Sequence, residues 1–262
     1  MHATEREKLI LEAIGLSGFI SYRDLEAGLD VSPATIRRDL SRLEAAGRIV
    51  RVHGGAKLPN DATSDLAGGL IGTPFDLSIT QNLAAKQAIG RAAAALCGPG
   101  EGIMIDGGTT TLQMCEHLAG LNCQVLTNSL HIVNALLPQK GTRILVPSGQ
   151  VFREQNIILA PAGEESMPRF HAPRLFMGAA AVGLQGVMQD DIILVAAERR
   201  LIDQAEQVIL LVDSSKFISS SGAIVCALDE VDLLITDKGI DAALAKDIER
   251  AGVRVITAGR FA

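Results

Sequence analysis

A run of polar residues after a short apolar segment has the composition of an anion-binding loop. The segment Ile103–Thr111 reads IMIDGGTTT, so a predicted strand ends in Asp106, two glycines and three threonines. Glycines let backbone N–H groups approach a ligand closely, and threonine hydroxyls at a helix N-terminus favour a phosphate. Because the run has neither the Gly-Lys-Ser/Thr of a P-loop nor a GxGxxG, it indicates a nucleotide only weakly. An ordinary strand-to-helix turn is the alternative interpretation.

Polar residues after other predicted strands would complete a site around this loop. Thr127-Asn128-Ser129 ends one strand and begins a helix, and Asp213-Ser214-Ser215-Lys216 follows another strand. Ligands of an open parallel sheet bind beyond the carboxyl ends of its strands, where both segments would lie. Lys216 can supply a cation to a phosphate. Lys86 and Glu198 would each, taken alone, be interpreted as an ordinary surface charge. Together with the loop and these polar segments, they predict a sugar-phosphate pocket.

A second group of charged residues lies near the N-terminus and has the composition of a nucleic-acid contact. Between Arg37 and Lys57, six basic residues stand against Asp39 and Glu44. Residues 1–60 carry nine Lys and Arg and eight Asp and Glu, a net charge of +1, whereas the whole chain carries −6. The positive charge is therefore local, which indicates nucleic acid at one end of the chain and a different task at the other.

The elements that would position these basic residues form a winged helix-turn-helix. Helices are predicted over Glu5–Ile14, Tyr22–Gly28 and Pro33–Ala46, the last with Ser32 as its N-cap. The alternating segment Arg48–His53 is typical of a strand and begins a two-stranded wing. The third helix can enter a major groove; a charged, solvated helix surface is the alternative interpretation. The residues expected to reach base edges and phosphates from it are Thr35, Arg37, Arg38 and Arg42.

Beyond this segment the sequence predicts a linker and a larger α/β domain. Residues 58–74 are rich in Gly, Pro, Asn, Asp, Ser and Thr, and the chain after them alternates apolar runs with helical patterns. Such alternation indicates a parallel sheet with helices on its faces. The expected domains are residues 1–57, a winged helix-turn-helix, and residues 75–262, the α/β domain. Strands are predicted over Gly102–Asp106, Gln124–Thr127, Arg143–Val146, Arg174–Gly178, Gln207–Asp213, Asp232–Thr236 and Arg254–Thr257.

Composition excludes several other classes of protein. Apolar residues make up 48% of the chain, enough for a core, but aromatic residues only 3%, which disfavours a stacking platform for single-stranded bases. The cysteines Cys97, Cys115, Cys123 and Cys226 form no CxxC pair, so neither a zinc site nor a disulfide framework is expected. Without an apolar leader or membrane-length run, a cytoplasmic chain is expected, with no membrane partner, cofactor or metal.

The stretch SPATIRRDLSRLEAAGRIVRVHGGA, residues 32–56, resembles the helix-turn-helix of the DeoR family of bacterial repressors of sugar catabolism, and the resemblance extends across nearly the whole chain. It implies a repressor rather than an enzyme, with double-stranded operator DNA, a phosphorylated sugar and further copies of the chain as partners, in a dimer or tetramer. The DNA contacts expected are Ser21, Tyr22, Ser32, Thr35, Arg37, Arg38, Arg42, Arg51 and His53. The effector contacts expected are Lys86, Asp106, Gly107, Gly108, Thr109, Thr110, Thr111, Thr127, Asn128, Ser129, Gly178, Glu198 and Lys216.

The sensor domain of that family resembles ribose-5-phosphate isomerase in fold, so a sugar-phosphate isomerase-type enzyme with an appended DNA-binding domain is the alternative. Glu198 and Lys216, eighteen residues apart, fall on the positions of that isomerase's catalytic glutamate and a later lysine. The isomerase's glycine-rich lead into its glutamate is absent, and Gly186–Asp190 stands there instead. Val146–Gly149 likewise replaces a Gly-Gly found in many members. The segment Ile158–Glu165 resembles the ascorbate-operon branch of the family.

Overall fold

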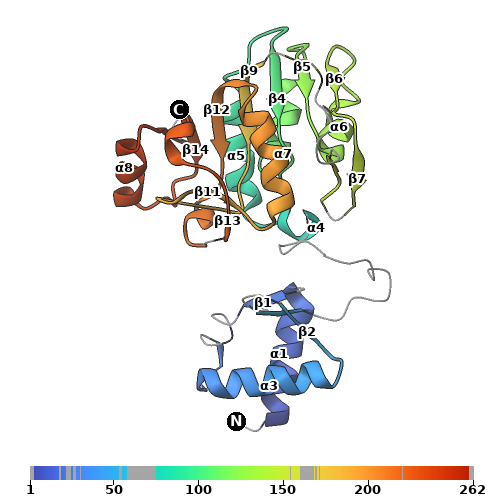
Figure 1. The fold of residues 1–262 in the computed structure, drawn as a ribbon, viewed down its shortest axis with the longest axis vertical. Coiled ribbons are helices and arrows are strands. Elements are labelled where there is room, and N and C mark those ends of the chain that lie inside the picture. The colour runs from blue at the N-terminus through green and yellow to red at the C-terminus, as the bar shows by residue number, and fades with distance from the viewer. Residues whose placement is uncertain are drawn as a thin grey trace. The chain divides into compact units, whose positions relative to one another are not determined.

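The computed structural model describes residues 3–17, 19–21, 25, 28–29, 31–52, 55–57, 75–153, 155–159, 168, 170, 172–219 and 221–259. These residues belong to two compact units, Met1–Thr73 and Pro74–Ala262 (Figure 1). They are named the reading unit and the sensor unit after the roles that the family resemblance implies. The predicted linker 58–74 and the predicted DNA contacts Tyr22 and His53 lie outside the described residues, as does most of Ile158–Glu165.

The reading unit consists of two described helices and a small sheet around one apolar core. Helix α1 (Ala3–Ser17) and helix α3 (Pro33–Ala45) bury Ile10, Ile14, Ile36 and Leu40 between them. The expected two-stranded wing has a third strand, because β1 (Phe19–Ser21) pairs with β3 (Gly55–Lys57), which pairs with β2 (Val50–Val52). A strand of three residues is too short to show a period-2 pattern, so the sequence did not reveal β1.

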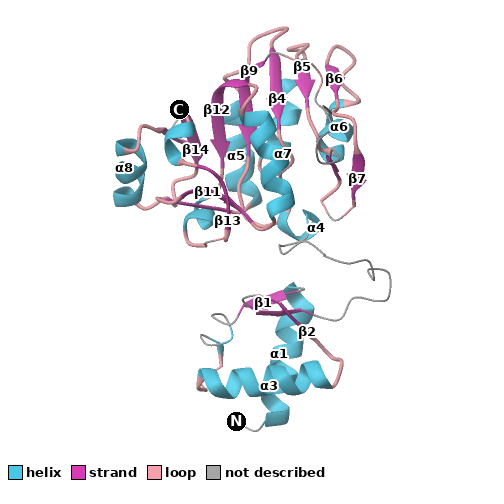
Figure 2. Cartoon of the chain, viewed as in Figure 1, coloured by secondary structure: helices cyan, strands magenta, loops and turns pink. Residues whose placement is uncertain are grey.

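The sensor unit is built on a seven-stranded parallel sheet, as the sequence predicted. Its strands follow the spatial order β15-β14-β12-β9-β4-β5-β6 (Figure 2). Each predicted apolar run forms one of these strands, although β9 and β12 each begin two residues earlier than expected. The strands are β4 (Gly102–Ile105), β5 (Gln124–Leu126), β6 (Arg143–Leu145), β9 (Ala172–Met177), β12 (Ala205–Leu211), β14 (Leu233–Thr236) and β15 (Arg254–Thr257).

Helices cover both faces of this sheet, because neighbouring residues of one strand point to opposite sides. Ile103 and Ile105 of β4 pack with α5 (Leu83–Ala94), the 3-10 helix η1 (Thr111–Leu118) and α6 (Leu130–Leu136). Met104 packs on the other side, with α7 (Ile192–Ile202) and α8 (Ala242–Arg250). The remaining helical segments are α4 (Phe75–Ser78), η2 (Ser214–Phe217) and η3 (Leu228–Glu230).

Two antiparallel additions were not predicted from the sequence. One is a sheet in the order β10 (Ala181–Gly183), β11 (Gly186–Gln189), β13 (Ala223–Cys226), and the other a hairpin of β7 (Gln150–Phe152) and β8 (Ile157–Leu159). The segment Gly186–Asp190, noted as a departure from the isomerase pattern, thus supplies strand β11. Gly186 has a φ of 125°, and a Cβ there would lie 2.2 Å from the Cys226 carbonyl oxygen, so glycine is required.

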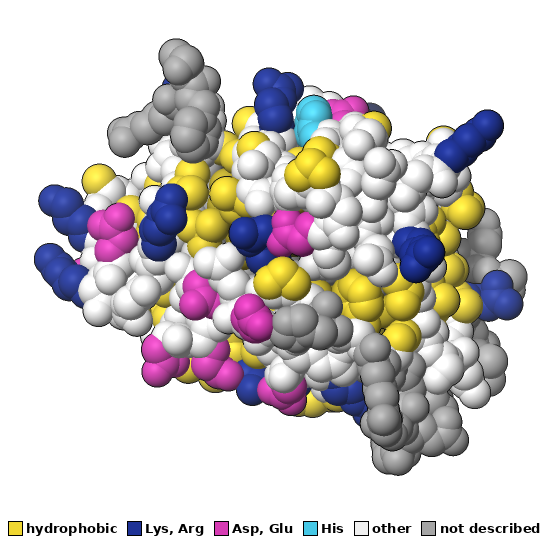
Figure 3. Space-filling model, turned by 90° about the horizontal axis from the view of Figure 1, so that it is seen from above, with side chains coloured by type: hydrophobic (Ala, Val, Ile, Leu, Met, Phe, Trp, Pro, Cys, Tyr) yellow, Lys and Arg dark blue, Asp and Glu magenta, His cyan; other side chains and the backbone are white. Residues whose placement is uncertain are grey.

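No helix among the described residues is long and apolar enough to span a membrane. Within the same ranges, no group of three or more His, Cys, Asp and Glu side chains is arranged to hold a metal ion. The four cysteines are free thiols, and Cys115, Cys123 and Cys226 are buried. On the face shown in Figure 3, basic, acidic and apolar side chains are interspersed rather than gathered into one basic field.

Candidate DNA-reading and effector-binding sites

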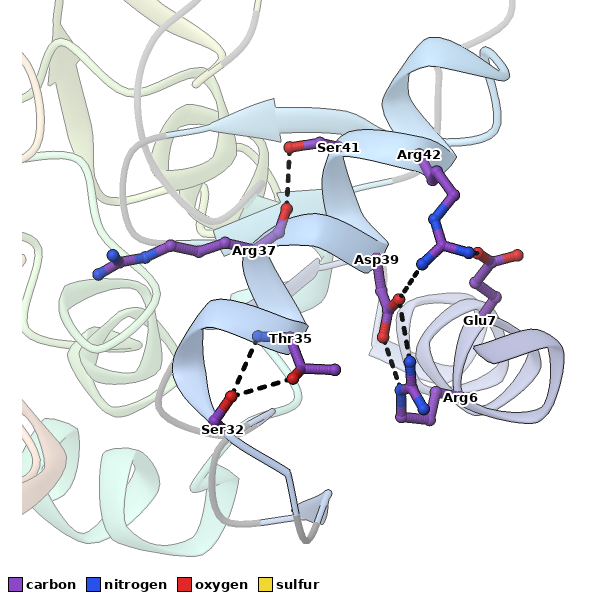
Figure 4. A network of polar contacts seen from close by, with 8 residues as sticks. All are labelled: Arg6, Glu7, Ser32, Thr35, Arg37, Asp39, Ser41 and Arg42. Atoms are coloured by element: carbon purple, nitrogen blue, oxygen red, sulfur yellow. Dashed lines mark hydrogen bonds and ion pairs between the residues drawn. The ribbon is translucent and has the colours of Figure 1, made fainter. Parts of the chain in front are cut away.

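The reading helix α3 is anchored by a buried ion-pair network. The carboxylate of Asp39, 1% exposed, accepts hydrogen bonds from Arg6 Nε at 2.6 Å, Arg6 Nη2 at 3.2 Å and Arg42 Nη2 at 2.8 Å (Figure 4). Arg42 Nη1 also lies 3.5 Å from Glu7 Oε1. This network joins α3 to α1 and fixes the angle between them. Arg42, expected at DNA, therefore also has a structural role, although its side chain is half exposed.

Of the other residues expected at DNA, some cap the start of α3 and others have exposed side chains. The Ser32 hydroxyl accepts from Thr35 N at 3.3 Å and bonds Thr35 Oγ1 at 2.9 Å, which caps α3. Arg37 and Arg38 are exposed and form no ion pair within the described part of the chain, and the Arg37 guanidinium extends away from the network (Figure 4). Ser21 lies in β1 and Arg51 in β2. Of the DNA contacts expected in α3, Arg37 and Arg38 are thus the arginines that are exposed and make no ion pair in the described part of the chain.

In the sensor unit, the order in which successive strands are added across the sheet reverses between β4 and β9. From β4 the chain continues to β5 and β6 on one side, whereas β9, on its other side, leads to β12, β14 and β15. The connections after β4 and β9 therefore lead away from each other, and in open parallel sheets the ligand site lies at such a switch point. The expected Asp106–Thr110 loop follows β4 there, and Gly178 follows β9.

Most of the predicted effector residues are buried where the parallel strands have their carboxyl ends, here called the carboxyl edge of the sheet. Gly107, Gly108, Thr109, Gly178 and Lys216 are only partly buried. The expected effector contacts did not include Gln189, which bonds Glu198, or Asn82, which bonds Asp213. The buried polar side chains of the predicted set are Lys86, Asp106, Thr110, Thr111, Thr127, Asn128, Ser129 and Glu198.

Several of the expected hydroxyls hold the loops themselves. Thr111 Oγ1 donates to the carbonyl oxygens of Asp106 at 2.9 Å and Gly108 at 3.0 Å. Thr127 Oγ1 accepts from Ser129 N at 3.1 Å, and Ser129 Oγ caps α6 by accepting from Ile132 N at 3.4 Å. Thr110 makes no side-chain hydrogen bond within the described residues. The side chain of Thr109, which is partly buried, likewise makes none in that part of the chain, so the hydroxyls of both threonines are available to a ligand.

Two carboxyl groups meet at the centre of the site. Asp106 and Glu198 are both buried, and Asp106 Oδ2 and Glu198 Oε2 have no hydrogen-bond partner among the described residues. Two buried carboxyl groups that interact this closely cannot both carry a charge at low cost, which favours a proton on one of them. Burial raises the pKa of Asp106 to about 6, and burial together with the nearby Asp106 charge raises the pKa of Glu198 well above its usual value. Gln189 Nε2 donates to Glu198 Oε1 at 2.5 Å. A pair that shares one proton can both donate to and accept from sugar hydroxyls.

The opposite corner of the site is cationic. Lys86 is 3% exposed, and its ammonium donates to the Ser78 carbonyl oxygen at 2.6 Å. Burial lowers the pKa of Lys86; the Asp213 charge opposes this shift, and the charge of neighbouring Lys216 adds to it. An ammonium has three N–H donors, so two on Lys86 have no partner among the described residues. A buried lysine with spare donors beside a second lysine is suited to an anion.

The Glu198→Gln variant is expected to flatten the pH dependence of the sensor unit's stability. The folded state holds a proton that the unfolded state releases near pH 4, so wild-type stability is full at low pH and falls by about 1.4 kcal/mol per pH unit until the folded pKa is passed. The glutamine amide donates permanently in place of that proton. Urea unfolding between about pH 5 and pH 8 measures the slope, with the exposed Glu249→Gln as control. Equal slopes in the wild type and Glu198→Gln would contradict the shared proton.

Comparison with known proteins identifies both units. Residues 6–62 match the DeoR-like helix-turn-helix domain, and residues 81–238 match the DeoR C-terminal sensor domain. "HTH-type transcriptional regulator UlaR" of Escherichia coli (strain K12 / DH10B) is 28% identical over 256 residues, which cover 98% of this chain and 99% of that protein. The protein of the same name from Shigella boydii serotype 18 has the same identity and coverage.

One solved structure with a similar chain length is the full-length sorbitol operon regulator SorC from Klebsiella pneumoniae. It shares 10% identity, with a TM-score of 0.37, over 88% of this chain and 93% of that one. The sensor-domain match alone spans more than half of the 262 residues. This chain belongs to the DeoR family of helix-turn-helix regulators.

Proposed function

We propose that this chain represses a carbohydrate-catabolism operon and that a phosphorylated sugar, bound in the sensor unit, controls its binding to operator DNA. The observation that carries the proposal is the buried cluster at the carboxyl edge of the sheet. Spare ammonium donors lie at one corner of it and a carboxyl pair at the other. The same chain presents exposed arginines on a capped helix of a DNA-reading fold.

The two corners of the site suit the two ends of one ligand. The phosphate is held by Lys86 and Lys216, with the Gly107–Thr111 loop and Thr110 beside them. The hydroxyl groups of the sugar bond to Asp106, Glu198 and Asn128, whose buried Oδ1 lacks a donor within the described residues. Because a carboxylate repels a phosphate, the carboxyl pair also sets the direction in which the ligand enters. Calorimetry with one sugar in its phosphorylated and unphosphorylated forms tests this assignment.

The reading unit contacts double-stranded DNA through α3. We assign Arg37 and Arg38 to base edges and phosphates, and Arg42 to a phosphate from its place in the Asp39 network. The Ser32 hydroxyl, which caps α3, and the Thr35 hydroxyl, which is bonded to it, would then hold the start of the helix near the DNA. One winged helix gives a small contact, so we propose a cytoplasmic homo-oligomer, a dimer or tetramer built through the sensor unit, which reads paired half-sites.

The alternative is a sugar-phosphate isomerase-type enzyme, and the carboxyl pair near a lysine is what favours it. The relatives are named transcriptional regulators, which supports a protein without catalytic activity. Turnover of a pentose phosphate by the purified chain would favour the enzyme and count against the repressor.

The Arg38→Ala variant is expected to lose operator affinity by about 5-fold to 150-fold, because one bidentate base contact is worth roughly 1–3 kcal/mol. Binding to random duplex should fall much less. The matched control is Arg51→Ala, which removes a predicted phosphate contact. It should weaken binding to both duplexes alike and flatten the salt dependence of binding. Gel shifts on the two duplexes measure the difference. Equal losses on both duplexes for Arg38→Ala would remove it from base reading.

A further inference from the structure

The segment Phe75–Asn82, here named the strap, precedes α5 and is anchored to the sensor unit at three points. The Phe75 ring stacks on His131 of α6 with 3.8 Å between ring centroids and 5° between planes. The Ser78 carbonyl oxygen accepts from Lys86 Nζ, and Asn82 Nδ2 donates to Asp213 Oδ1 at 2.8 Å. Asn82 itself has a φ of 51°, the left-handed conformation that turns the strap into α5.

Each anchor of the strap belongs to the carboxyl edge of the sheet. His131 lies in the helix that follows Thr127–Ser129, and Asp213 comes two residues after β12. Lys86 is the cation of the proposed phosphate corner. The strap thus shares its central anchor with the effector site. Its first residue, Phe75, is 7% exposed, so the stack is part of the packed structure rather than a surface contact.

Lys86 can hold the strap and an anion together. The Ser78 carbonyl occupies one of three ammonium donors, which leaves two for the oxygens of a phosphate. A phosphate also offsets the repulsion between Lys86 and Lys216, so it favours the charged form that the Ser78 carbonyl binds. Conversely, a docked strap keeps the ammonium in place before the anion arrives, whereas a free lysine must lose side-chain entropy on binding.

We propose that docking of the strap and binding of an anion at Lys86 and Lys216 are positively coupled, so that each strengthens the other. This inference rests on the proposed effector site. Because the strap follows residues 58–74 directly in the chain, the coupling gives the effector a covalent route toward the reading unit. Coupling between two binding events is reciprocal, so it can be measured from either side.

Hydrogen exchange of the full chain measures the coupling from the side of the strap. The probes are inorganic phosphate and a set of pentose and hexose phosphates, each added at saturation. We expect backbone amides of residues 76–82 to exchange several-fold more slowly with a bound anion, while amides of α8, residues 242–250, are unchanged. Unchanged exchange in 76–82 would overturn the inference, and faster exchange would show that anion and strap compete for Lys86.

The Phe75→Ala variant measures the coupling from the side of the ligand. Removing the stacked ring should loosen residues 76–82 and weaken anion affinity about fivefold or more, although Phe75 lies outside the proposed ligand contacts. Leu137→Ala, which truncates an exposed apolar residue at the end of α6, is the matched control and should leave the affinity as in the wild type. Unaltered affinity in Phe75→Ala would overturn the inference.

The failure of this inference and the failure of the proposed function give different results. If neither inorganic phosphate nor any sugar phosphate binds the wild type in calorimetry, the effector site is wrong and the coupling falls with it. If they bind, and Lys216→Ala weakens that binding, the site stands. The strap inference is then wrong if the hydrogen-exchange rates of residues 76–82 are the same with and without the ligand.

Discussion

Replacing Asp39 with alanine is expected to unfold the reading unit under conditions in which the sensor unit stays folded. The carboxylate is the shared partner of Arg6 and Arg42, and the Arg6 side chain is only 11% exposed. Removing one partner of a buried ion pair leaves a desolvated charge and costs about 3–5 kcal/mol. A small domain has a total stability of roughly 5 kcal/mol, so the loss consumes most of it. Operator binding should disappear as a consequence.

Hydrogen exchange of the full chain separates this effect from a general loss of stability. Amides of α1 and α3 should lose protection in Asp39→Ala while those of β4, β9 and β12 keep it. Glu44→Ala on the exposed side of α3 is the control, and its effect should stay within about 1 kcal/mol. If Asp39→Ala retains protected α1 and α3 amides and full operator affinity, the network does not hold the reading helix.

Replacing Lys86 with methionine is expected to lower effector affinity by about 150-fold or more without weakening the fold. Hydrogen bonds to a charged group contribute about 1.5–3 kcal/mol each, and two ammonium donors face the proposed phosphate. Methionine fills a similar volume without a charge, so the cost of a buried cation disappears and the free energy of unfolding should stay level or rise. A loss of binding together with unchanged or higher stability distinguishes a ligand contact from a structural residue.

Calorimetry with phosphorylated sugars measures the effector affinity, and urea unfolding measures the free energy of unfolding. The control is Lys246→Met, which replaces an exposed lysine of α8 and changes the net charge by the same amount as Lys86→Met. Its effector affinity should match the wild type. Full affinity in Lys86→Met would place the phosphate elsewhere and leave Lys86 with no role beyond holding the strap.

The main sheet was predictable from the sequence because its strands are buried on both faces. Runs such as Val208–Leu211 and Leu233–Ile235 are continuously apolar, and each is followed by a polar segment that lies at the carboxyl edge. The N-cap at Ser32 and the Asp106–Thr111 loop were readable for a related reason, since turn and cap chemistry is local in sequence. The fold class and most of the candidate site follow from such local patterns.

The features that the sequence did not predict depend on contacts between distant residues. The bond from Gln189 to Glu198 needs strand β11, whose pairing with β13 is decided by tertiary packing rather than by a period in the sequence. Asp39 lies in a helix rich in charge, and nothing local shows that Arg6, thirty-three residues earlier, reaches it. Likewise, the hydroxyls of Thr111, Thr127 and Ser129 suit a phosphate by type, and the structure shows that they hold the loops.

Operator binding titrated with paired sugars tests the central claim most directly. The full chain is bound to its operator, and fluorescence anisotropy is followed while one sugar is added in its phosphorylated and then in its unphosphorylated form. We expect a phosphorylated sugar to change operator affinity in the wild type and the unphosphorylated form to leave it unchanged. Lys86→Met should bind operator normally without responding to either form. An equal response to both forms of the sugar, or a wild-type response in Lys86→Met, would contradict this claim.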